Sequence, residues 1–285
     1  MLGIHCVLAD YSWVQLAQMV VVLMCAGLAA GFVAGLFGIG GGFVVVPALL
    51  LVFHFFGFDE DVVTHTAIGT SLATIIVTSL RSLQAHHKKK AVDFQIIRDW
   101  LPWLLVGVVF GLLLARFMDG ASLKLIFSVG VFLMGIHFIY PVNAGMKKAF
   151  KPEMPKGVRL ASIASFLGGF SALLGIGGGT IAVLVMTTCG RKIHQAVATA
   201  AGFGVIIALP GAIGFAIIGM GQEDLLPGSI GYINVIAALA VTSMSVITAP
   251  MGAKLAHALD GNKLKKIFGI YLILTSALVF YKAFA

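Results

Sequence analysis

Two glycine-rich septets are the residues of this chain whose type and spacing most clearly suggest chemistry. Residues 36–42 read LFGIGGG and residues 173–179 read LLGIGGG, each within an apolar run that continues beyond it. If a helix begins after each septet, free backbone N–H groups and the positive end of a helix dipole face the glycines. Because glycine has no side chain, the backbone could approach an anion closely there. The septets therefore predict an anion site formed by Gly38, Gly40, Gly41, Gly42, Gly175, Gly177, Gly178 and Gly179.

Helix packing is the main alternative for glycine in such a chain. Gly27, Gly31 and Gly35 are spaced by four and are explained by close helix contacts within a membrane. Three consecutive glycines differ, because each costs about 1 kcal/mol relative to alanine in a helix interior. The septets therefore favour an unwound segment. A nucleotide-binding loop is disfavoured, because GIGGGF lacks the final glycine of GxGxxG.

Hydroxyl side chains are the second group of candidates. Residues 64–82 read THTAIGTSLATIIVTSLRS, and threonines recur there at every fourth residue and share a helix face. Such a face could line an anion path, whereas bonding back to carbonyl oxygens of the same helix is the alternative. A similar stretch, ATAAGF, lies at residues 198–203 and contains Thr199. Thr180 directly follows the second septet, where its hydroxyl could cap a helix or contact the ligand. The candidates are Thr66, Thr70, Ser71, Thr180 and Thr199.

Histidines are the ionisable candidates for function. His65 and His194 lie near the starts of apolar segments beside the repeated threonine motif, so either could relay a proton. A position at the membrane interface without that role is the alternative. No Asp, Glu, Lys or Arg lies in the body of an apolar segment, so the sequence predicts neither a metal site nor a cofactor. A coupling ion, if there is one, could be a proton or sodium.

The composition explains why these residues lie in apolar runs. Of 285 residues, 60% are hydrophobic and 11% are charged, against about 25% charged residues in soluble domains. We therefore expect an all-α integral membrane protein whose main partner is the lipid bilayer. Although the net charge is +8, the Lys and Arg residues lie mostly in short connections between apolar runs. That placement indicates membrane orientation and argues against a nucleic-acid partner.

Two halves of the chain resemble each other. Besides the septets, DGASLKLIF at 119–127 resembles DGNKLKKIF at 260–268, so residues 1–145 and 146–285 are predicted to be two copies of one unit. Each unit contains five apolar segments, of which the first two form a hairpin broken at its glycines near the membrane midplane. The ten predicted segments are 13–36, 39–57, 62–82, 100–115, 123–141, 158–174, 179–189, 194–219, 228–253 and 265–284.

The charges of the connections predict the orientation of these units. An odd number of segments per unit means that the second unit is inverted relative to the first. If the basic linker between the units is cytoplasmic, all but three of the 19 Lys and Arg residues fall inside, the exceptions being Arg116, Lys124 and Lys282. We therefore expect two inverted repeats in a bacterial-type inner membrane, with both termini outside.

At the level of motifs, the chain resembles the TauE/SafE family. The resemblance lies in LFGIGGGFVVVPALL, the later LLGIGGG, the AIGTSL stretch and the KKAVDF segment after a basic loop. It implies a transporter without enzyme activity, for sulfite, sulfonates or related organosulfur anions. One departure is Ala91, where the family pattern has glycine, whereas the corresponding GSIGY at 228–232 keeps it.

The expected function is that of a secondary transporter moving a small sulfur-containing anion by alternating access. An anion channel, or a carrier for a small carboxylate without sulfur, is the alternative. An intramembrane protease is disfavoured, because neither GxSxG nor HExxH occurs in the sequence. The transported anion, the direction of transport and assembly as a homo-oligomer stay open.

Overall fold

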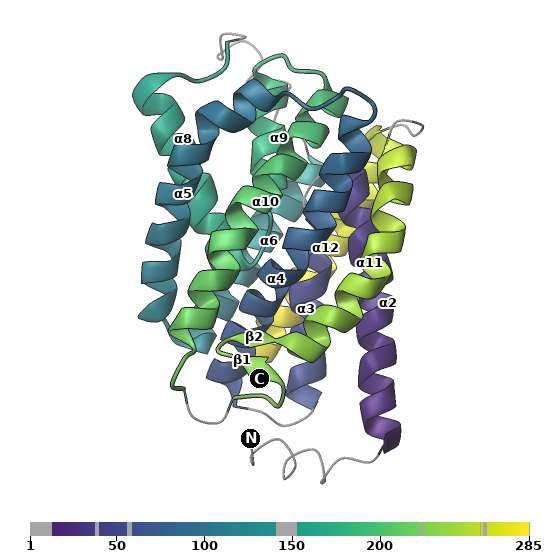
Figure 1. Cartoon of the computed structure of the whole chain (residues 1–285), viewed down its shortest axis with the longest axis vertical. Helices are drawn as coiled ribbons and strands as arrows, with labels where there is room; N and C mark the ends of the chain where they lie inside the picture. Colours follow the sequence, from purple (N-terminus) through teal and green to yellow (C-terminus); the bar gives the residue numbers. More distant parts are fainter. Residues whose placement is uncertain are drawn as a thin grey trace.

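The protein is a bundle of α-helices with one short β-hairpin. The computed structural model describes residues 13–37, 40–55, 59–140, 153–222, 225–256, 258 and 261–284. Within these residues the helices run roughly along one axis of the molecule (Figure 1). They are α2 (Trp13–Phe37), α3 (Gly42–Phe55), α4 (Glu60–His87), α5 (Phe94–Arg116), α6 (Gly120–Ile139), α8 (Gly157–Leu174), α9 (Gly179–Thr188), α10 (Ile193–Ile218), α11 (Val235–Ala256) and α12 (Gly261–Phe284).

Length and composition make seven of these helices candidates for crossing a membrane. They are α2, α4, α5, α6, α8, α10 and α11, whereas α3, α9 and the stretch Gly269–Tyr281 of α12 are shorter apolar helices. The expectation of an all-α, multi-pass integral membrane protein is confirmed at this level. The two short helices α3 and α9 each follow a glycine septet, as a broken hairpin requires. The inverted relation of the two halves stays a prediction.

One predicted segment begins later than expected. The sequence placed a helix over 228–253, but α11 begins at Val235, and the preceding residues form the strands β1 (Ser229–Ile230) and β2 (Ile233–Asn234). Gly228 and Gly231 have φ values of 78° and 53°, which the helix does not allow. The side chain of Asn234 then accepts a hydrogen bond from the backbone N–H of Ala237 and starts α11.

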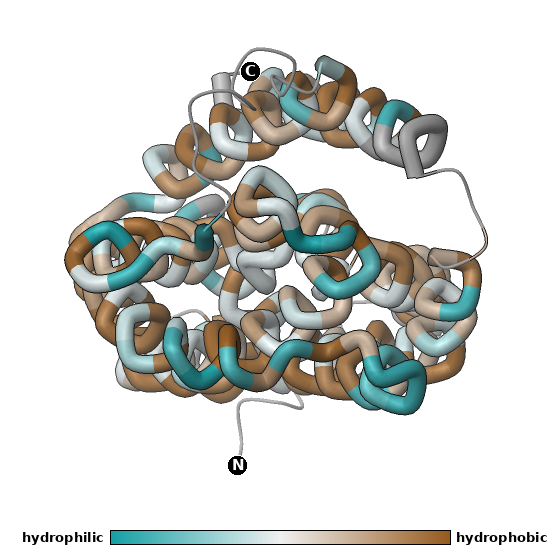
Figure 2. Tube along the Cα trace, turned by 90° about the horizontal axis from the view of Figure 1, so that it is seen from above, coloured by the Kyte–Doolittle hydropathy of each residue, from teal (hydrophilic) through white to brown (hydrophobic). Residues whose placement is uncertain are grey.

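The helices pack in pairs that cross between the two halves of the sequence. α2 packs on α11 and α5 packs on α8, while α4 packs on α10 and α6 on α12. Seen from above, the segments beside the C-terminus form a layer on one side of the bundle (Figure 2). Many exposed side chains of the helices are large and hydrophobic. α4 is the central helix, with 83% of its apolar window buried inside the protein. The segment with the most predicted hydroxyl candidates is therefore surrounded by other helices.

Small residues allow the closest of these contacts. A Cβ atom added to Gly27, Gly31 or Gly35 of α2 would collide with backbone atoms of α11. On the other pair, a Cβ on Gly168 of α8 would collide with the carbonyl oxygen of Leu104 in α5. The packing interpretation of the glycines spaced by four is thus confirmed.

Gly31→Val should therefore destabilise the bundle by about 1–3 kcal/mol, because overpacking forces α2 away from α11. The readout is the unfolding temperature of the purified protein in detergent. Ala29→Val is the matched control, since Ala29 lies on the exposed side of the same helix. An unfolding temperature equal to that of the control would contradict the close packing of α2 on α11.

Candidate anion site

The two glycine runs meet in the folded protein. A Cβ atom on Gly40 would lie 3.4 Å from the Cα atom of Gly177. A Cβ atom on Gly42 would collide with the carbonyl oxygen of Gly175 and would lie 2.9 Å from the Cα atom of Ile176. Backbone segments from opposite halves of the sequence are therefore in direct contact. Of the predicted glycines, Gly38 lies outside the residues that the structure describes.

Positive φ angles explain why these positions are glycine. Gly175 ends α8 with a φ of 64°, and Gly178 precedes α9 with a φ of 67°. In the first run Gly40 and Gly41 have φ values of 77° and 80° directly before α3. Side chains other than glycine rarely adopt this conformation. The interruption of the helix at each septet is thus confirmed.

Each run is followed by the N-terminus of a short helix. α9 begins after Gly178 without a hydrogen bond from a capping side chain. α3 and α9 extend from the glycine runs toward opposite ends of the molecule (Figure 1). Two helix N-termini, each with unsatisfied N–H groups and a partial positive charge, therefore start from one region. Such an arrangement can bind an anion without any charged side chain.

Hydroxyl groups of α4 bind the carbonyl oxygens of both runs. Ser71 Oγ donates a hydrogen bond of 2.8 Å to the carbonyl of Gly175, and Thr78 Oγ1 donates one of 2.9 Å to the carbonyl of Gly40. Ser71 was predicted from the sequence as a site residue, and the structure places it against the second run. Thr78 belongs to the same threonine stripe. α4 therefore fixes the position of the two runs relative to each other.

Two further serines lie beside the runs with hydroxyl groups that have no protein partner. Ser79 and Ser171 are fully buried, and among the described residues neither Oγ atom has a hydrogen-bond partner. Ser79 Oγ lies 3.1 Å from the position of a Cβ on Gly40, and Ser171 Oγ lies 3.1 Å from that of a Cβ on Gly178. Buried hydroxyls normally have a partner, so a bound water molecule or ligand is expected beside each of them. The sequence prediction missed both, although Ser171 precedes Gly175 by one helical turn.

The other predicted hydroxyls have different surroundings. Thr66 is buried and, within the described residues, its Oγ1 atom also lacks a partner. Thr180, in the first turn of α9, donates to the sulfur atom of Met134 in α6. Thr70 accepts a 2.8 Å hydrogen bond from the backbone N–H of Asn234, and Thr199 accepts one of 3.0 Å from that of Asp93. Thr70 and Thr199 therefore bind loop backbone, and Ser71 is the predicted hydroxyl that the structure brings to a glycine run.

Replacing Thr70 with valine should leave the buried N–H group of Asn234 without its partner. An unsatisfied buried donor costs about 1–3 kcal/mol, so the β-hairpin should open more often. Hydrogen exchange measured at the Asn234 amide is expected to accelerate in Thr70→Val. The exchange of the Asp93 amide, which depends on Thr199, serves as the internal control, and parallel acceleration of both amides would contradict a local effect.

The two histidines predicted as proton sites have different surroundings in the structure. His65 is buried in α4, and its ring nitrogens lie close to backbone carbonyl oxygens. His194 is exposed in the first turn of α10. His65 therefore has the surroundings of a specific site, and His194 has those of a surface residue.

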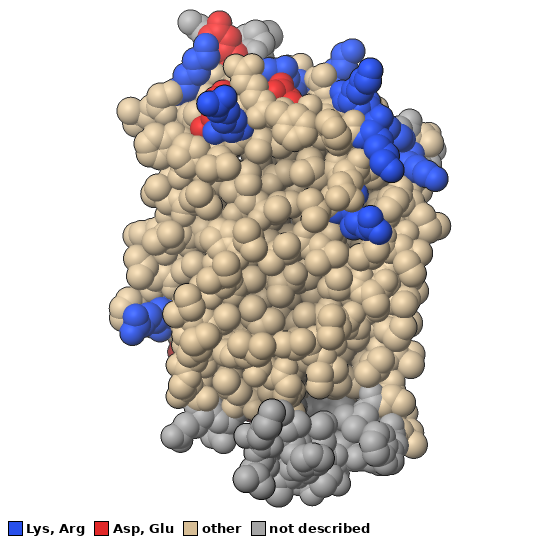
Figure 3. Space-filling view, in the orientation of Figure 1, with Lys and Arg blue, Asp and Glu red and all other residues tan. Residues whose placement is uncertain are grey.

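Basic side chains gather toward one end of the molecule. Figure 3 shows Lys and Arg residues mainly in the upper half of this face, with a further basic group at the left edge of its lower half. α2 begins and α12 ends at the opposite end (Figure 1). The exposed basic residues of the connections and helix ends include Lys88, Lys89, Lys90, Arg98, Lys156, Arg159, Arg191, Lys192 and Lys254. This asymmetry agrees in direction with the predicted charge bias, and which side is cytoplasmic stays a prediction.

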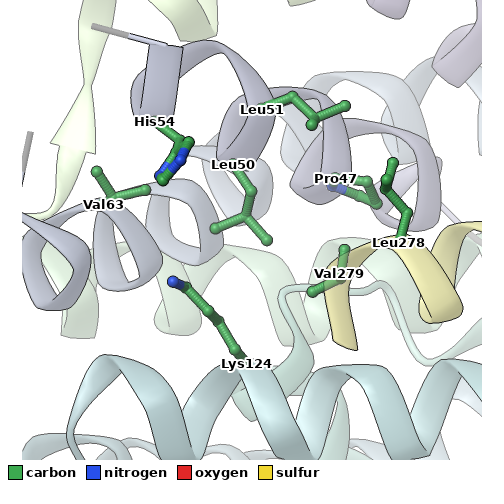
Figure 4. Close-up of a pocket in the computed structure, with 8 residues that line it drawn as sticks. All are labelled: Pro47, Leu50, Leu51, His54, Val63, Lys124, Leu278 and Val279. Carbon is green, nitrogen blue, oxygen red and sulfur yellow. The ribbon is translucent and has the colours of Figure 1, made fainter. Parts of the chain in front are cut away.

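A small cavity lies near the far end of α3. It has a volume of about 20 Å³, enough for about one water molecule. The buried Lys124 of α6 points its ammonium group toward His54 and Val63 (Figure 4). None of the residues that line this cavity belongs to a glycine run. Within the described residues, no group of three or more His, Cys, Asp or Glu side chains could hold a metal ion.

Comparison with known proteins supports a transport role. Residues 23–279 match the family model described as sulfite exporter TauE/SafE. A "probable membrane transporter protein" of Haemophilus influenzae is 33% identical over 92% of this chain and 98% of its own length. Relatives with the same description from Methanocaldococcus jannaschii and Bacillus subtilis are 25% and 27% identical, over 88% and 92% of this chain and 94% and 97% of their own lengths. No solved structure matches the chain.

Proposed function

Because the chain belongs to the TauE/SafE family of membrane transporters, we propose that it is a secondary carrier for a small sulfur-containing anion of the sulfite or organosulfonate type. The observation that carries the proposal is the contact between the two glycine runs. Beside them lie the hydroxyls of Ser79 and Ser171, which have no partner within the described part of the chain. Backbone N–H groups, helix dipoles and hydroxyls would together bind the oxygen atoms of the anion.

The chemistry of these groups suits a small oxyanion. A hydrogen bond to a charged acceptor is stronger than one between neutral groups, and the low dielectric of a buried site increases the difference. Several backbone N–H and hydroxyl donors around one point match an anion whose oxygen atoms point in different directions.

The arrangement of the helices supports alternating access. The pairs α2–α11 and α5–α8 correspond to each other if the two halves are related by a pseudo-two-fold axis, and the pairs α4–α10 and α6–α12 would then lie on that axis. Two hydrogen bonds also join the halves. The N–H of Asn234 in the second half donates to Thr70 in the first, and the N–H of Asp93 in the first half donates to Thr199 in the second. Rocking of one half against the other would change the side from which the glycine runs are reached.

Transport into proteoliposomes tests the proposal. Purified protein is expected to take up [35S]sulfite with saturable kinetics, and unlabelled sulfite or an alkyl sulfonate on the opposite side should accelerate exchange. Acetate and chloride, tested in the same way, distinguish a carboxylate or halide substrate. Flux without saturation and without accelerated exchange would indicate an anion channel, and absence of anion flux would contradict the proposal.

We also propose an inner-membrane location with both termini outside the cytoplasm, on the basis of the charge distribution. A bacterial alkaline phosphatase fused after residue 285 folds only outside the cytoplasm. An active fusion would support this orientation, and an inactive but expressed fusion would contradict it.

A further inference from the structure

The buried side chain of His65 faces two hydrogen-bond acceptors. Its Nδ1 atom lies 2.8 Å from the carbonyl oxygen of Asp61, and its Nε2 atom lies 3.3 Å from the carbonyl oxygen of Ala115. Carbonyl oxygens only accept hydrogen bonds, and a neutral imidazole carries a hydrogen on only one nitrogen. Both contacts are therefore hydrogen bonds only when the ring is an imidazolium. In the neutral form, a nitrogen lone pair faces a carbonyl oxygen.

The aromatic surroundings of His65 also favour a positive charge. Its ring stacks on Tyr232 with a centroid distance of 4.8 Å and an interplanar angle of 27°, and the ring of Phe215 lies 6.4 Å away. The face of an aromatic ring attracts a cation. Tyr232 belongs to the turn of the β-hairpin, between β1 and β2.

The charged groups near His65 come from three elements. Asp61 lies one turn earlier in α4, and its carboxylate accepts a hydrogen bond from the backbone N–H of Gly120. Asp119 caps α6; its pKa is lowered chiefly by hydrogen bonds to Ser122, and the charge of His65 acts in the same direction. Arg116, at the end of α5, is exposed, and Lys124 lies in α6 one turn beyond the cap. Of these groups, the carboxylate of Asp119 interacts favourably with a positive charge on His65.

His65 connects the two halves of the sequence at this end of the bundle. Its carbonyl partners belong to α4 and α5, whereas Tyr232 belongs to the second half. The hairpin is closely seated there, because a Cβ on Gly69 would collide with the carbonyl oxygen of Tyr232, and Asn234 donates to Thr70. A change in the charge of His65 therefore acts on the contact between α4 and the hairpin.

We propose that His65 is the binding site of the coupling proton, and that the imidazolium form holds the β-hairpin against α4 and α5. This inference rests on the proposed function and assigns its driving ion. When the proton leaves to water, the attraction between the imidazolium and the ring of Tyr232 is lost, and one nitrogen also loses its hydrogen bond to α4 or α5. The hairpin therefore separates more easily from α4. Proton binding and movement of one half against the other are thereby linked.

Nitrogen NMR of the whole protein in lipid nanodiscs tests the proton site without any substrate. With 15N-labelled histidine, His65 is identified by the signal missing in His65→Gln. The expected result is an imidazolium that becomes neutral as the pH is raised, with faster hydrogen exchange of the Asn234 amide over the same change after correction for intrinsic rates. A ring that stays neutral at every pH at which the protein is folded, or an unchanged corrected exchange rate at Asn234, would overturn the proposal.

Transport provides the second test. A pH gradient should drive accumulation of [35S]sulfite in proteoliposomes with the wild-type protein and with His194→Gln, whose histidine is exposed. His65→Gln should lose accumulation by the gradient while retaining sulfite exchange, and retained accumulation would contradict the assignment.

A folding control and a transport control complete the design. If His65→Gln does not fold, Tyr232→Leu replaces it, and the imidazolium form of His65 should be less populated in that variant than in the wild type at the same pH, because the aromatic face is gone. If the wild-type protein moves no anion at all, the proposed function fails, while the NMR titration still decides whether His65 binds the proton.

Discussion

Gly42→Ala should lower the initial rate of sulfite uptake by about tenfold or more, which corresponds to about 1.4 kcal/mol. The added Cβ atom would collide with the carbonyl oxygen of Gly175, which belongs to the backbone and cannot move aside like a flexible side chain. The substitution therefore separates the two glycine runs. The uptake rate in proteoliposomes, normalised to the amount of folded protein, is the measurement.

Gly130→Ala is the matched control for this substitution. Gly130 is also a buried glycine within a helix, but its added Cβ would meet only the ends of the side chains of Phe170 and Leu174, at 2.8 Å and 3.0 Å. These ends can shift, so uptake should remain near that of the wild type. Equal uptake by Gly42→Ala and Gly130→Ala would show that contact between the runs is not needed.

Ser79→Ala and Ser171→Ala should each weaken anion binding by about tenfold or more, since a hydrogen bond to a charged group contributes about 1.5–3 kcal/mol. Without anion, the unfolding temperature should stay at or slightly above that of the wild type, because neither hydroxyl has a protein partner among the described residues. The measurement is the rise of the unfolding temperature with increasing sulfite, from which the dissociation constant follows.

Ser162→Ala tests whether this effect is specific to the site. Ser162 lies on the exposed side of α8, the helix that contains Ser171, and donates to the carbonyl of Val158 in its own helix. Its replacement should leave the response to sulfite unchanged. A normal response in both Ser79→Ala and Ser171→Ala would exclude these hydroxyls as anion ligands.

The sequence predicts the helices and their interruptions well. The long apolar runs define α2 and α10 to within one residue at each end, because period and hydropathy are local properties. α4 ends at His87, five residues beyond the predicted segment, because its last turns are polar. Three consecutive glycines predict the breaks before α3 and α9, since the backbone there needs φ values that other residues avoid. The start of α11 was placed too early, because apolar Ile230 and Ile233 belong to a hairpin whose turn glycines fix the chain reversal.

The contents of the site depend on contacts that local patterns do not contain. Nothing in the spacing of the threonines distinguishes Ser71, which binds the carbonyl of Gly175, from Thr70, which binds the N–H of Asn234. These adjacent residues point to different neighbours, and the neighbours are known only once α4 is packed. Ser171 was missed for the same reason, since its position beside Gly178 follows from how α8 and α9 fold around the second septet.

Direct location of a bound anion tests the central claim, that the two glycine runs form one anion site. Crystals of the protein with selenate, a selenium analogue of a sulfur oxyanion, would reveal the anion by anomalous scattering. The account predicts one peak between residues 40–42 and 175–179, within hydrogen-bond distance of Ser79 Oγ or Ser171 Oγ. A peak only at the cavity of Lys124 and His54, or an anion bound elsewhere with the glycine runs empty, would contradict it.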